Sequence, residues 1–535
     1  MTLPVVLFTL LSCLTAIVSP WLGVVFYYIL AVGQIKSLFP HDFGNSRSSL
    51  YITLATLVGL VLATATRQVD WRRLVQWPNL LMMLMLACVN LSHAFSNFEE
   101  YDHILRLPLT SSEIVVVINK IMLMFFMATL LIDTRFKLIF LITTIAAIFF
   151  YYTLWANEIY FTGELWRFGD NGRLNGPWGA YYDENYFAML FVLLTPILYY
   201  LSIGTSNRWI RYGLWLAIPL SWHALFLTSS RGGLFSLSIV CIYIFFRSYS
   251  KKASVVLVVA LVVAVVDQGG NMLDRINSTV SAEEEERARA YIENTDDSPE
   301  IGDKAIDPRV ISWQVGLQIM RDYPLLGVGS GNFMKAFPEY HDSRPHVAHN
   351  TFVQIGASAG IASALIYLYF LWMRLKNVFS KPDPTKKYAN GHKRDYLDDL
   401  VNGMFVGFYC IALFLDLQVL EILYFILLIG FCKYSLESKK EKARFGLIES
   451  IYRWKQDQES DAMQEVQDRD PTGSDVLVPQ GPLVAGAMAA ESATASVLEA
   501  ESGVTTAPAR GTQRAGNTIG SAAAYAANQY ARKAS

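Results

Sequence analysis

The sequence predicts an all-α membrane protein that crosses the bilayer many times, and two observations carry this prediction. Of the 535 residues, 53% are hydrophobic and only 17% are charged. The apolar residues are gathered into many uncharged runs that are long enough to form bilayer-spanning helices. Together these features predict a polytopic membrane protein and argue against a soluble domain.

The apolar runs give the expected helices in chain order. They lie at about residues 4–18, 20–38, 49–66, 74–94, 114–132, 136–156, 184–203, 209–228, 231–247, 253–267, 350–374, 400–416 and 418–435. This pattern predicts about 12 or 13 transmembrane helices. The first two runs have no A-x-A-like cleavage site, so we expect a retained membrane segment rather than a signal peptide.

The chain divides into two parts by composition. Residues 1–436 form the expected transmembrane domain, which includes one long loop at 268–348. Residues 437–535 are first charged and then rich in Ala, Gly, Ser and Thr, a composition that buries too little apolar surface to offset the entropy of ordering. We therefore expect a largely disordered tail there.

Charge predicts the orientation in the bilayer. When the expected helices are threaded alternately, the basic segments "RQVDWRR", "DTRFK", "SNRWIR", "RSYSKK", "RLKNVFSKPDPTKKYANGHKR" and "KKEKAR" fall on one side. The positive-inside rule makes this side, with the tail, cytoplasmic. The loop 268–348 falls on the other side and carries 14 Asp/Glu against 8 Lys/Arg. It is expected to face the outside.

Four ionisable residues converge on the outer side and form the candidate site. Arg231 lies in "TSSRGG" where a span meets the outer face, and Arg173 lies in the outer loop "NGRLNGPWGAYYDENYF". Arg309 opens an amphipathic stretch of the long loop, and His349 closes that loop in "HNTFVQIGASAG". Three arginines at one membrane face suggest an anion site, because the guanidinium fork suits bidentate contact with phosphate.

Each of these residues also has a structural interpretation. An arginine at a helix end commonly extends to the interface or binds free carbonyls. Asn350 and Asn185 could orient the histidine or bind sugar, but helix capping or packing is the favoured explanation of both. Gly356 and Gly360 in "GASAG" make a small-xxx-small pattern for close helix packing.

The combination of motifs resembles a known family. "SSRGG", then "DPRVISWQVGLQIMRDYPLLGVGSGNFMKAFPEY" and "HNTFVQIGASAG", with "GRLNGPWGAYYDENYFAM" upstream, resembles the O-antigen ligase and O-antigen polymerase superfamily of bacterial membrane glycosyltransferases, and within it the O-glycosylation ligase branch. The resemblance covers roughly residues 150–375 and implies a GT-C-like fold. Ser358 stands where the family commonly has an acid.

The resemblance implies transfer of a glycan from an undecaprenyl diphosphate carrier to an acceptor hydroxyl at the periplasmic face of the inner membrane. The acceptor would be a glycolipid, a protein or a glycan. His349 would be the base, and Arg231, Arg309 and Arg173 would hold the diphosphate. No cofactor is expected, and the partners would be the lipid-linked donor, the acceptor and the bilayer, with no nucleic acid.

Three alternatives stay open. A polymerase of the same superfamily shares the donor chemistry and differs only in the acceptor. A transporter or flippase for lipid-linked sugars also needs a cationic patch, but it should place charges near mid-membrane or show repeated halves, neither of which is visible. A zinc site at His341, His346 and His349 has tempting spacing but no cysteine or H-E-x-x-H helix to support it.

Overall fold

The computed structural model describes most of residues 1–438. The described residues are 3–43, 46–96, 110–163, 168, 172–177, 179–247, 255, 257, 259, 261–262, 308–342, 345–378 and 395–438. Within them the fold is helical and contains no strand, only one isolated bridge between Phe168 and Leu174. This confirms the all-α prediction. Residues 439–535 of the expected tail, and residues 268–307 of the long loop, lie outside the described part of the chain.

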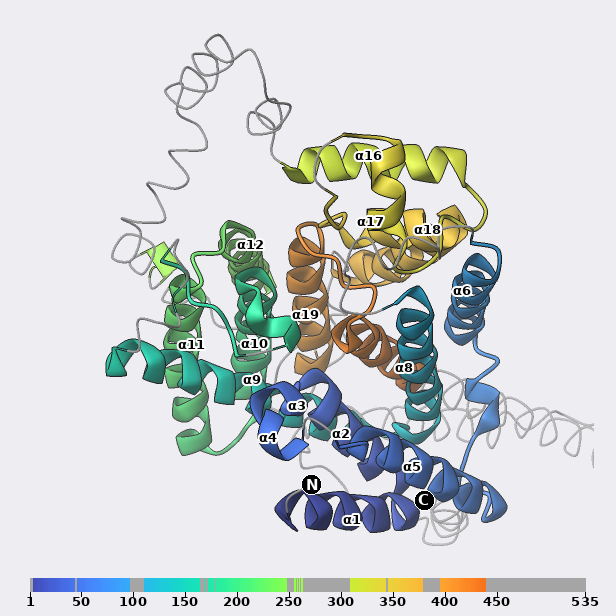
Figure 1. Cartoon of the computed structure of the whole chain (residues 1–535). Helices are drawn as coiled ribbons and strands as arrows, with labels where there is room; N and C mark the ends of the chain where they lie inside the picture. The colour runs from blue at the N-terminus through green and yellow to red at the C-terminus, as the bar shows by residue number, and fades with distance from the viewer. Residues whose placement is uncertain are drawn as a thin grey trace, which may run out of the picture. The chain divides into compact units, whose positions relative to one another are not determined.

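The helices follow the expected order (Figure 1). The first group is α1 (Leu3–Val18), α2 (Pro20–Val32), α3 (Ile35–Leu38), α4 (Pro40–Phe43), α5 (Ser48–Ala65), α6 (Trp77–Ala94), α8 (Ser111–Leu131) and α9 (Arg135–Thr162). The second group is α10 (Glu184–Gly204), α11 (Arg208–Leu227), α12 (Arg231–Arg247), α16 (Pro308–Asp322), α17 (Phe333–Ala336), α18 (Thr351–Val378), α19 (Tyr396–Ala412) and a last helical stretch at residues 421–438.

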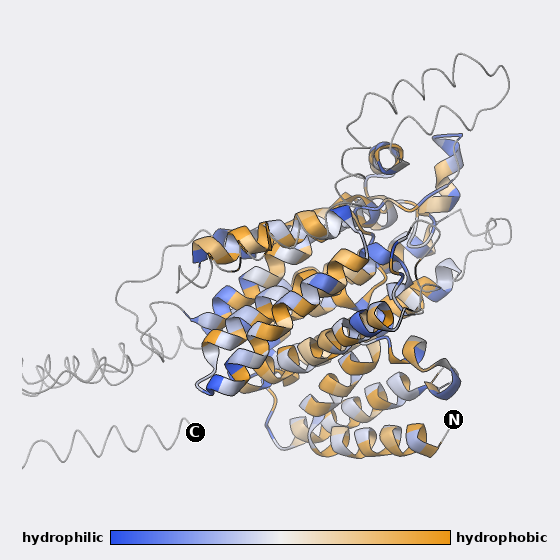
Figure 2. Ribbon diagram, turned by 90° about the vertical axis from the view of Figure 1, so that its left-hand side faces the viewer, coloured by the Kyte–Doolittle hydropathy of each residue, from blue (hydrophilic) through white to orange (hydrophobic). Residues whose placement is uncertain are grey.

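Five of the described helices, α5, α8, α9, α10 and α18, are long and apolar enough by themselves to cross a membrane. Every other expected span also coincides with a helix, except 253–267, which lies largely outside the described residues. The chain is thus a polytopic membrane protein. Hydrophobic residues predominate along many of its helices (Figure 2). On α5, Leu54, Val58 and Val61 are exposed. Exposed leucine and valine in such numbers suit contact with lipid.

Helix α10 forms the centre of the bundle and packs against α9, α11, α12 and α19. Of the 18 residues in its most apolar stretch, 83% are buried, which is the highest share among the five candidate spans. Asp183 starts this helix, because its Oδ1 accepts hydrogen bonds from the backbone N–H groups of Asn185 at 2.8 Å and Tyr186 at 3.2 Å. The cap fixes where "DENYF" enters the bundle.

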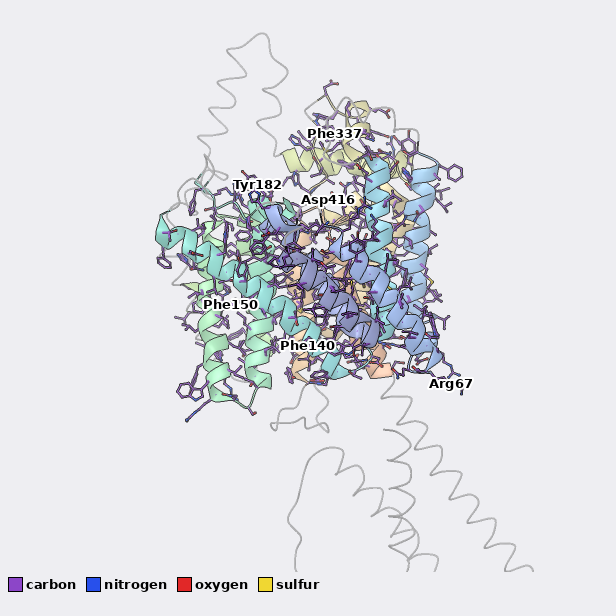
Figure 3. The ribbon with its side chains drawn as sticks, turned by 60° about the horizontal axis from the view of Figure 1, so that its bottom comes forward. Arg67, Phe140, Phe150, Tyr182, Phe337 and Asp416 are labelled. Atoms are coloured by element: carbon purple, nitrogen blue, oxygen red, sulfur yellow. The ribbon has the colours of Figure 1, made fainter. Side chains whose placement is uncertain are left out.

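One end of the bundle collects basic side chains that are held by neighbouring helices. The pairs are Arg135 with Asp395, Arg247 with Asp399, Lys433 with Asp398 and Glu437, and Arg374 with Asn402. These arginines belong to or adjoin segments that the positive-inside rule assigns to one side. Figure 3 shows Arg67 toward one end of the bundle and Tyr182, Phe337 and Asp416 toward the other, which we call the site end.

Helix α18 is broken. Ala359 and Gly360 have non-helical backbone angles, and Gly360 has φ +83°. The loop 323–332 fills the break, since the N–H groups of Val328 and Gly329 donate to the carbonyls of Ala357 and Ser358 at 2.9 and 3.1 Å. The expectation of close helix packing at "GASAG" therefore holds for Gly356 but not for Gly360. Gly356 lies in close contact with Met320 of α16, whereas Gly360 interrupts the helix and faces the carbonyl of Leu325.

Candidate functional site at one end of the bundle

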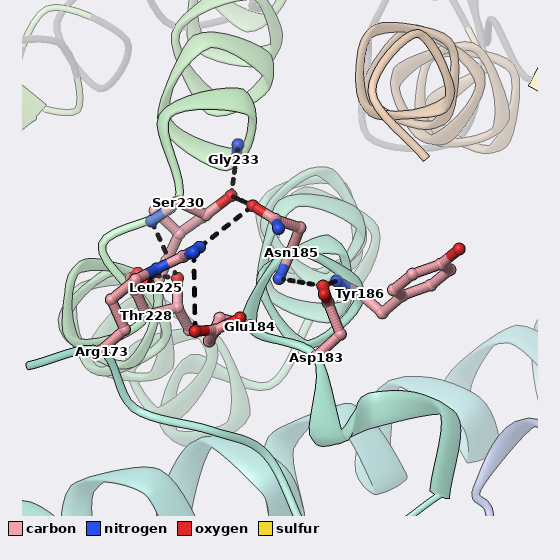
Figure 4. A network of polar contacts seen from close by, with 9 residues as sticks. All are labelled: Arg173, Asp183, Glu184, Asn185, Tyr186, Leu225, Thr228, Ser230 and Gly233. Atoms are coloured by element: carbon pink, nitrogen blue, oxygen red, sulfur yellow. Dashed lines mark hydrogen bonds and ion pairs between the residues drawn. The ribbon is translucent and has the colours of Figure 1, made fainter. Parts of the chain in front are cut away.

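Arg173 and Asn185 belong to one polar network at the site end (Figure 4). Arg173 donates from Nε to the Thr228 carbonyl and from Nη2 to Asn185 Oδ1, both at 3.1 Å, and its Nη1 lies 3.5 Å from Glu184. Asn185 Oδ1 also accepts from Ser230 Oγ at 2.8 Å. The network joins the loop before α10 to the turn before α12. Arg173 is therefore already engaged by the protein.

Arg231 follows this network directly as the first residue of α12, and its side chain is exposed. The turn before it is tight, since Ser229 has φ +47° and the Gly233 N–H donates to Ser230 Oγ at 3.1 Å. A Cβ at Gly233 would lie 2.9 Å from that of Ala188 on α10. The "SRGG" motif thus lets α12 approach α10 closely while its arginine stays accessible.

His349 sits just before α18 in the left-handed backbone region, with φ +46°. Its turn is fixed on both sides, because the Ala348 N–H donates to Gln354 Oε1 at 3.2 Å and Asn350 caps the helix. Asn350 Oδ1 accepts from the N–H groups of Phe352 and Val353 at 3.0 and 3.2 Å. The capping role that the sequence left open for Asn350 is therefore present, and the imidazole of His349 is partly exposed.

Arg309 lies near the start of α16, which packs along the first half of α18. Gly316 contacts Val353, Met320 contacts Gly356, and the Ile361 N–H donates to the Pro324 carbonyl at 2.9 Å. In these contacts the residue numbers increase together along α16 and α18, so the two helices run in the same direction. Arg309 lies roughly 10 Å before Gly316 along the helix, at 1.5 Å per residue. It therefore lies toward the His349 end of α18.

A loop at residues 413–418, which sequence reasoning missed, joins these elements. Thr351 Oγ1 donates to the Leu415 carbonyl at 2.7 Å, and the Tyr186 hydroxyl donates to the Asp416 carbonyl at 2.7 Å. Phe414 packs edge-on against Phe235 of α12, with ring centroids 5.9 Å apart. The starts of α10, α12 and α18 therefore meet around one loop.

The same loop carries a buried polar link to "PLLGVGSGNF". Gln418 Nε2 donates to Ser330 Oγ at 3.1 Å, and both side chains are almost completely buried. Asp416 is partly buried, and burial raises the pKa of its carboxyl to about 6, although the hydrogen bond from the Gln418 N–H opposes this. The sequence signal for this loop was the single carboxylate in "LFLDLQV", which lies between two apolar runs. An ionisable residue next to membrane-spanning segments is a candidate for function.

No group of three or more His, Cys, Asp or Glu side chains within the described ranges is arranged to hold a metal ion. The three histidines of the zinc alternative lie within these ranges, and the rings of His341 and Phe337 pack with their centroids 6.3 Å apart. The zinc hypothesis thus gains no support from the described geometry.

The fold and the site end define the class: an all-helical polytopic membrane protein with arginines and a histidine presented at one end of the bundle. Comparison with protein families then gives a specific match, because residues 213–368 fit the family model described as O-antigen ligase. This segment is similar to the O-antigen ligase family, and the match supports a membrane glycosyltransferase of the O-antigen ligase or polymerase type. It contains Arg231, Arg309 and His349, whereas Arg173, Asn185 and the loop 413–418 lie outside it. A search of curated proteins found no match.

Proposed function

We propose that this protein transfers a glycan from undecaprenyl diphosphate to an acceptor hydroxyl at the periplasmic face of the bacterial inner membrane. The observation that carries the proposal is the O-antigen ligase domain at 213–368, which spans Arg231, Arg309 and His349. The geometry supports the proposal as well. The first turn of α12, which carries Arg231, and the first turn of α18, which follows His349, both contact the loop 413–418.

The arginines are proposed to bind the donor diphosphate. As the acceptor oxygen attacks the sugar C1, the bond from C1 to the phosphate oxygen breaks, and its electron pair leaves with the diphosphate. Arg231 is exposed at the start of α12 and Arg309 is partly exposed at the start of α16, so both can reach a ligand at the site end. Two guanidinium groups in a poorly hydrated interface would stabilise the developing charge without a metal.

Arg173 is proposed for a supporting role. It holds Asn185 and the Thr228 carbonyl, and thereby positions the turn that precedes Arg231. Its guanidinium is also held by an ion pair with Glu184. Asn185 and Asn350 are likewise proposed to hold the site in place, since both amide oxygens accept hydrogen bonds from the protein.

His349 is proposed as the base that accepts the proton of the acceptor hydroxyl. Imidazole is the side chain whose protonation changes nearest neutral pH, and this histidine is partly exposed beside a rigid turn. Its position at the entry of α18 lets an acceptor approach from outside the membrane, where a saccharide or a protein hydroxyl would be presented.

A deletion strain tests the proposed reaction. Loss of a ligase leaves glycan of the normal length ladder that is not attached to its acceptor, whereas loss of a polymerase leaves single-repeat products. Ladder chains that stay on the carrier are the expected outcome. Purified protein with lipid-linked donor should transfer the glycan in excess EDTA, and a loss of transfer restored by a divalent metal would contradict the arginine mechanism.

A further inference from the structure

A cavity lies at the basic end of the bundle, opposite the candidate site. It has a volume of about 260 Å³ and is lined by the ends of α18 and the last helical stretch, the start of α6, and α19. Its polar lining includes Arg374, Lys376, Tyr434 and Glu437. The remaining lining is mostly apolar, and includes Phe370, Phe405, Leu427 and Phe431. Neither the proposed transfer reaction nor the O-antigen ligase match gives this cavity a role.

Arg374 is the unusual member of the lining. Its side chain is 5% exposed, its Nη2 donates to Asn402 Oδ1 at 3.0 Å, and its guanidinium lies 5.7 Å from the ring centroid of Phe405. Its Nε has no hydrogen-bond partner among the described residues. A buried cationic donor left without a partner is costly, so this geometry calls for an acceptor from outside the helices.

The carboxylates near Arg374 are engaged elsewhere. Lys433 forms ion pairs with both Asp398 and Glu437, the latter at 2.7 Å. Lys376 makes no ion pair within the described part of the chain, and its Nζ lies over the ring of Trp372 at 5.2 Å. The cavity lining therefore carries two cations, Arg374 and Lys376, and one carboxylate, Glu437, which is paired with Lys433. The cavity favours an anion.

The surroundings of the cavity point to the lipid headgroup region. Trp77, next to the lining residue Pro78, is 59% exposed, and Trp372 is 58% exposed. Exposed tryptophans at the ends of membrane helices mark the interface between hydrocarbon and water. Leu368 of α18 and Leu80 of α6 are also exposed, each at 40%. Acyl chains would cover these apolar faces while a phosphate entered the cavity.

We propose that this cavity binds the phosphate of an anionic phospholipid, with Arg374 and Lys376 as its cationic ligands and the acyl chains along α6 and α18. Sequence adds charge complementarity, because "RLKNVFSKPDPTKKYANGHKR" and "KKEKAR" leave the two helices that line the cavity. Basic clusters beside transmembrane helices attract anionic lipid. The site is independent of the transfer reaction at the opposite end.

The test uses the full-length protein in mild detergent, with bound lipid measured by native mass spectrometry and by thermal unfolding. We expect dioleoyl phosphatidylglycerol to raise the unfolding temperature by at least about 2 °C. Dioleoyl phosphatidylcholine, which has the same acyl chains but no net charge, should bind roughly tenfold more weakly. Inorganic phosphate should give no shift. Equal effects of the two lipids, or the full shift with phosphate alone, would overturn the lipid assignment.

Two variants tie the binding to the cavity. Arg374→Gln should weaken phosphatidylglycerol binding by about tenfold, whereas Arg208→Gln, an exposed arginine at the start of α11, should not change it. If Arg374→Gln fails to fold, Met373→Trp fills the cavity and leaves the arginine in place, and it should abolish the same binding. Binding at the wild-type level in either folded cavity variant would contradict the proposal.

Discussion

His349 is held in a backbone conformation that favours glycine, and its turn is fixed by the Ala348 and Asn350 hydrogen bonds. Among the described non-glycine residues only Gln34, Arg67, Ser229 and His349 have positive φ. Two of these four lie beside the proposed site, at "SSRGG" and "HN". A residue in this region costs on the order of 1–3 kcal/mol, and such strain gathers at functional sites.

This strain gives a test of the histidine role. His349→Asn should keep the fold within about 1 kcal/mol, because asparagine tolerates the left-handed region better than most residues. Transfer should nevertheless fall by roughly 10²–10⁴ fold, the usual loss for a general base, while donor lipid still binds. Turnover and donor binding of the purified variant would be measured in parallel. Lost donor binding with normal turnover of bound donor would point to a structural histidine.

Arg231→Lys tests whether the planar fork of the guanidinium matters at the start of α12. Lysine keeps the charge but loses bidentate contact with phosphate, so we expect transfer to fall by about tenfold or more. Arg208→Lys is the matched control, since Arg208 is also an exposed first residue of a helix but lies at the opposite end. Near wild-type transfer by Arg231→Lys would remove Arg231 from the donor site.

Asp416 predicts a pH dependence of stability. Burial raises its pKa to about 6 from 3.8, so folding is favoured when the carboxyl is protonated. That contribution is present below about pH 4 and is lost as the pH rises through about 6. Asp416→Asn keeps the oxygen that accepts from the Gln418 N–H and removes the charge. At pH 7 the variant should be more stable than the wild type by on the order of 1–3 kcal/mol.

The measurement is the unfolding temperature of both proteins between pH 4 and pH 8. The difference between variant and wild type should grow across this range and level off above about pH 7. A difference that does not vary with pH would mean that Asp416 is neutralised by a partner in the folded state.

Among the elements, the break in α18 depends on one glycine. A Cβ at Gly360 would clash with the carbonyl of Leu325, and the residue also has φ +83°. Gly163 offers a matched control, because it has φ +72° but nothing within 4 Å of a Cβ. Gly163→Ala should cost about 1–2 kcal/mol for the backbone alone, and Gly360→Ala at least about 3 kcal/mol.

The difference in unfolding temperature between these two variants isolates the steric contact of the loop 323–332 with α18. Equal effects of the two substitutions would mean that the loop yields to the added methyl group. A larger effect of Gly360→Ala would establish that "PLLGVGSGNF" and "SAG" are one structural unit, which explains why these motifs occur together in this sequence.

At the scale of the whole molecule, the two ends of the bundle should face opposite sides of the membrane. A reporter fused after Pro338 should be periplasmic, and one fused after Lys386 should be cytoplasmic, because the basic segments gather at the end where α18 stops. Alkaline phosphatase and green fluorescent protein fusions would measure this. Both fusion points on one side would contradict the shared outer face of Arg231, Arg309 and His349.

Sequence predicts the elements of this fold well and their interruptions poorly. Uncharged apolar runs locate the helices because the bilayer requires them. The motifs "SSRGG" and "HN" suggest the candidate site, because they place polar residues at helix starts. The break at Gly360 is hidden, since "GASAG" is equally compatible with a continuous helix. The loop 413–418 is hidden as well, because its links to Tyr186 and Thr351 join residues more than 60 positions apart.

The break in α18 also predicts how deep each half of this helix lies in the bilayer. Residues 361–378 extend roughly 27 Å at 1.5 Å per residue, which nearly matches a hydrocarbon core of about 30 Å. This second half alone can therefore cross the apolar layer. The loop 323–332 and α16 are bound to the first half. We expect this first half to lie above the apolar layer. His349 would then lie among the phosphates and water of the headgroup region, where a water-soluble acceptor and a membrane-held donor can meet.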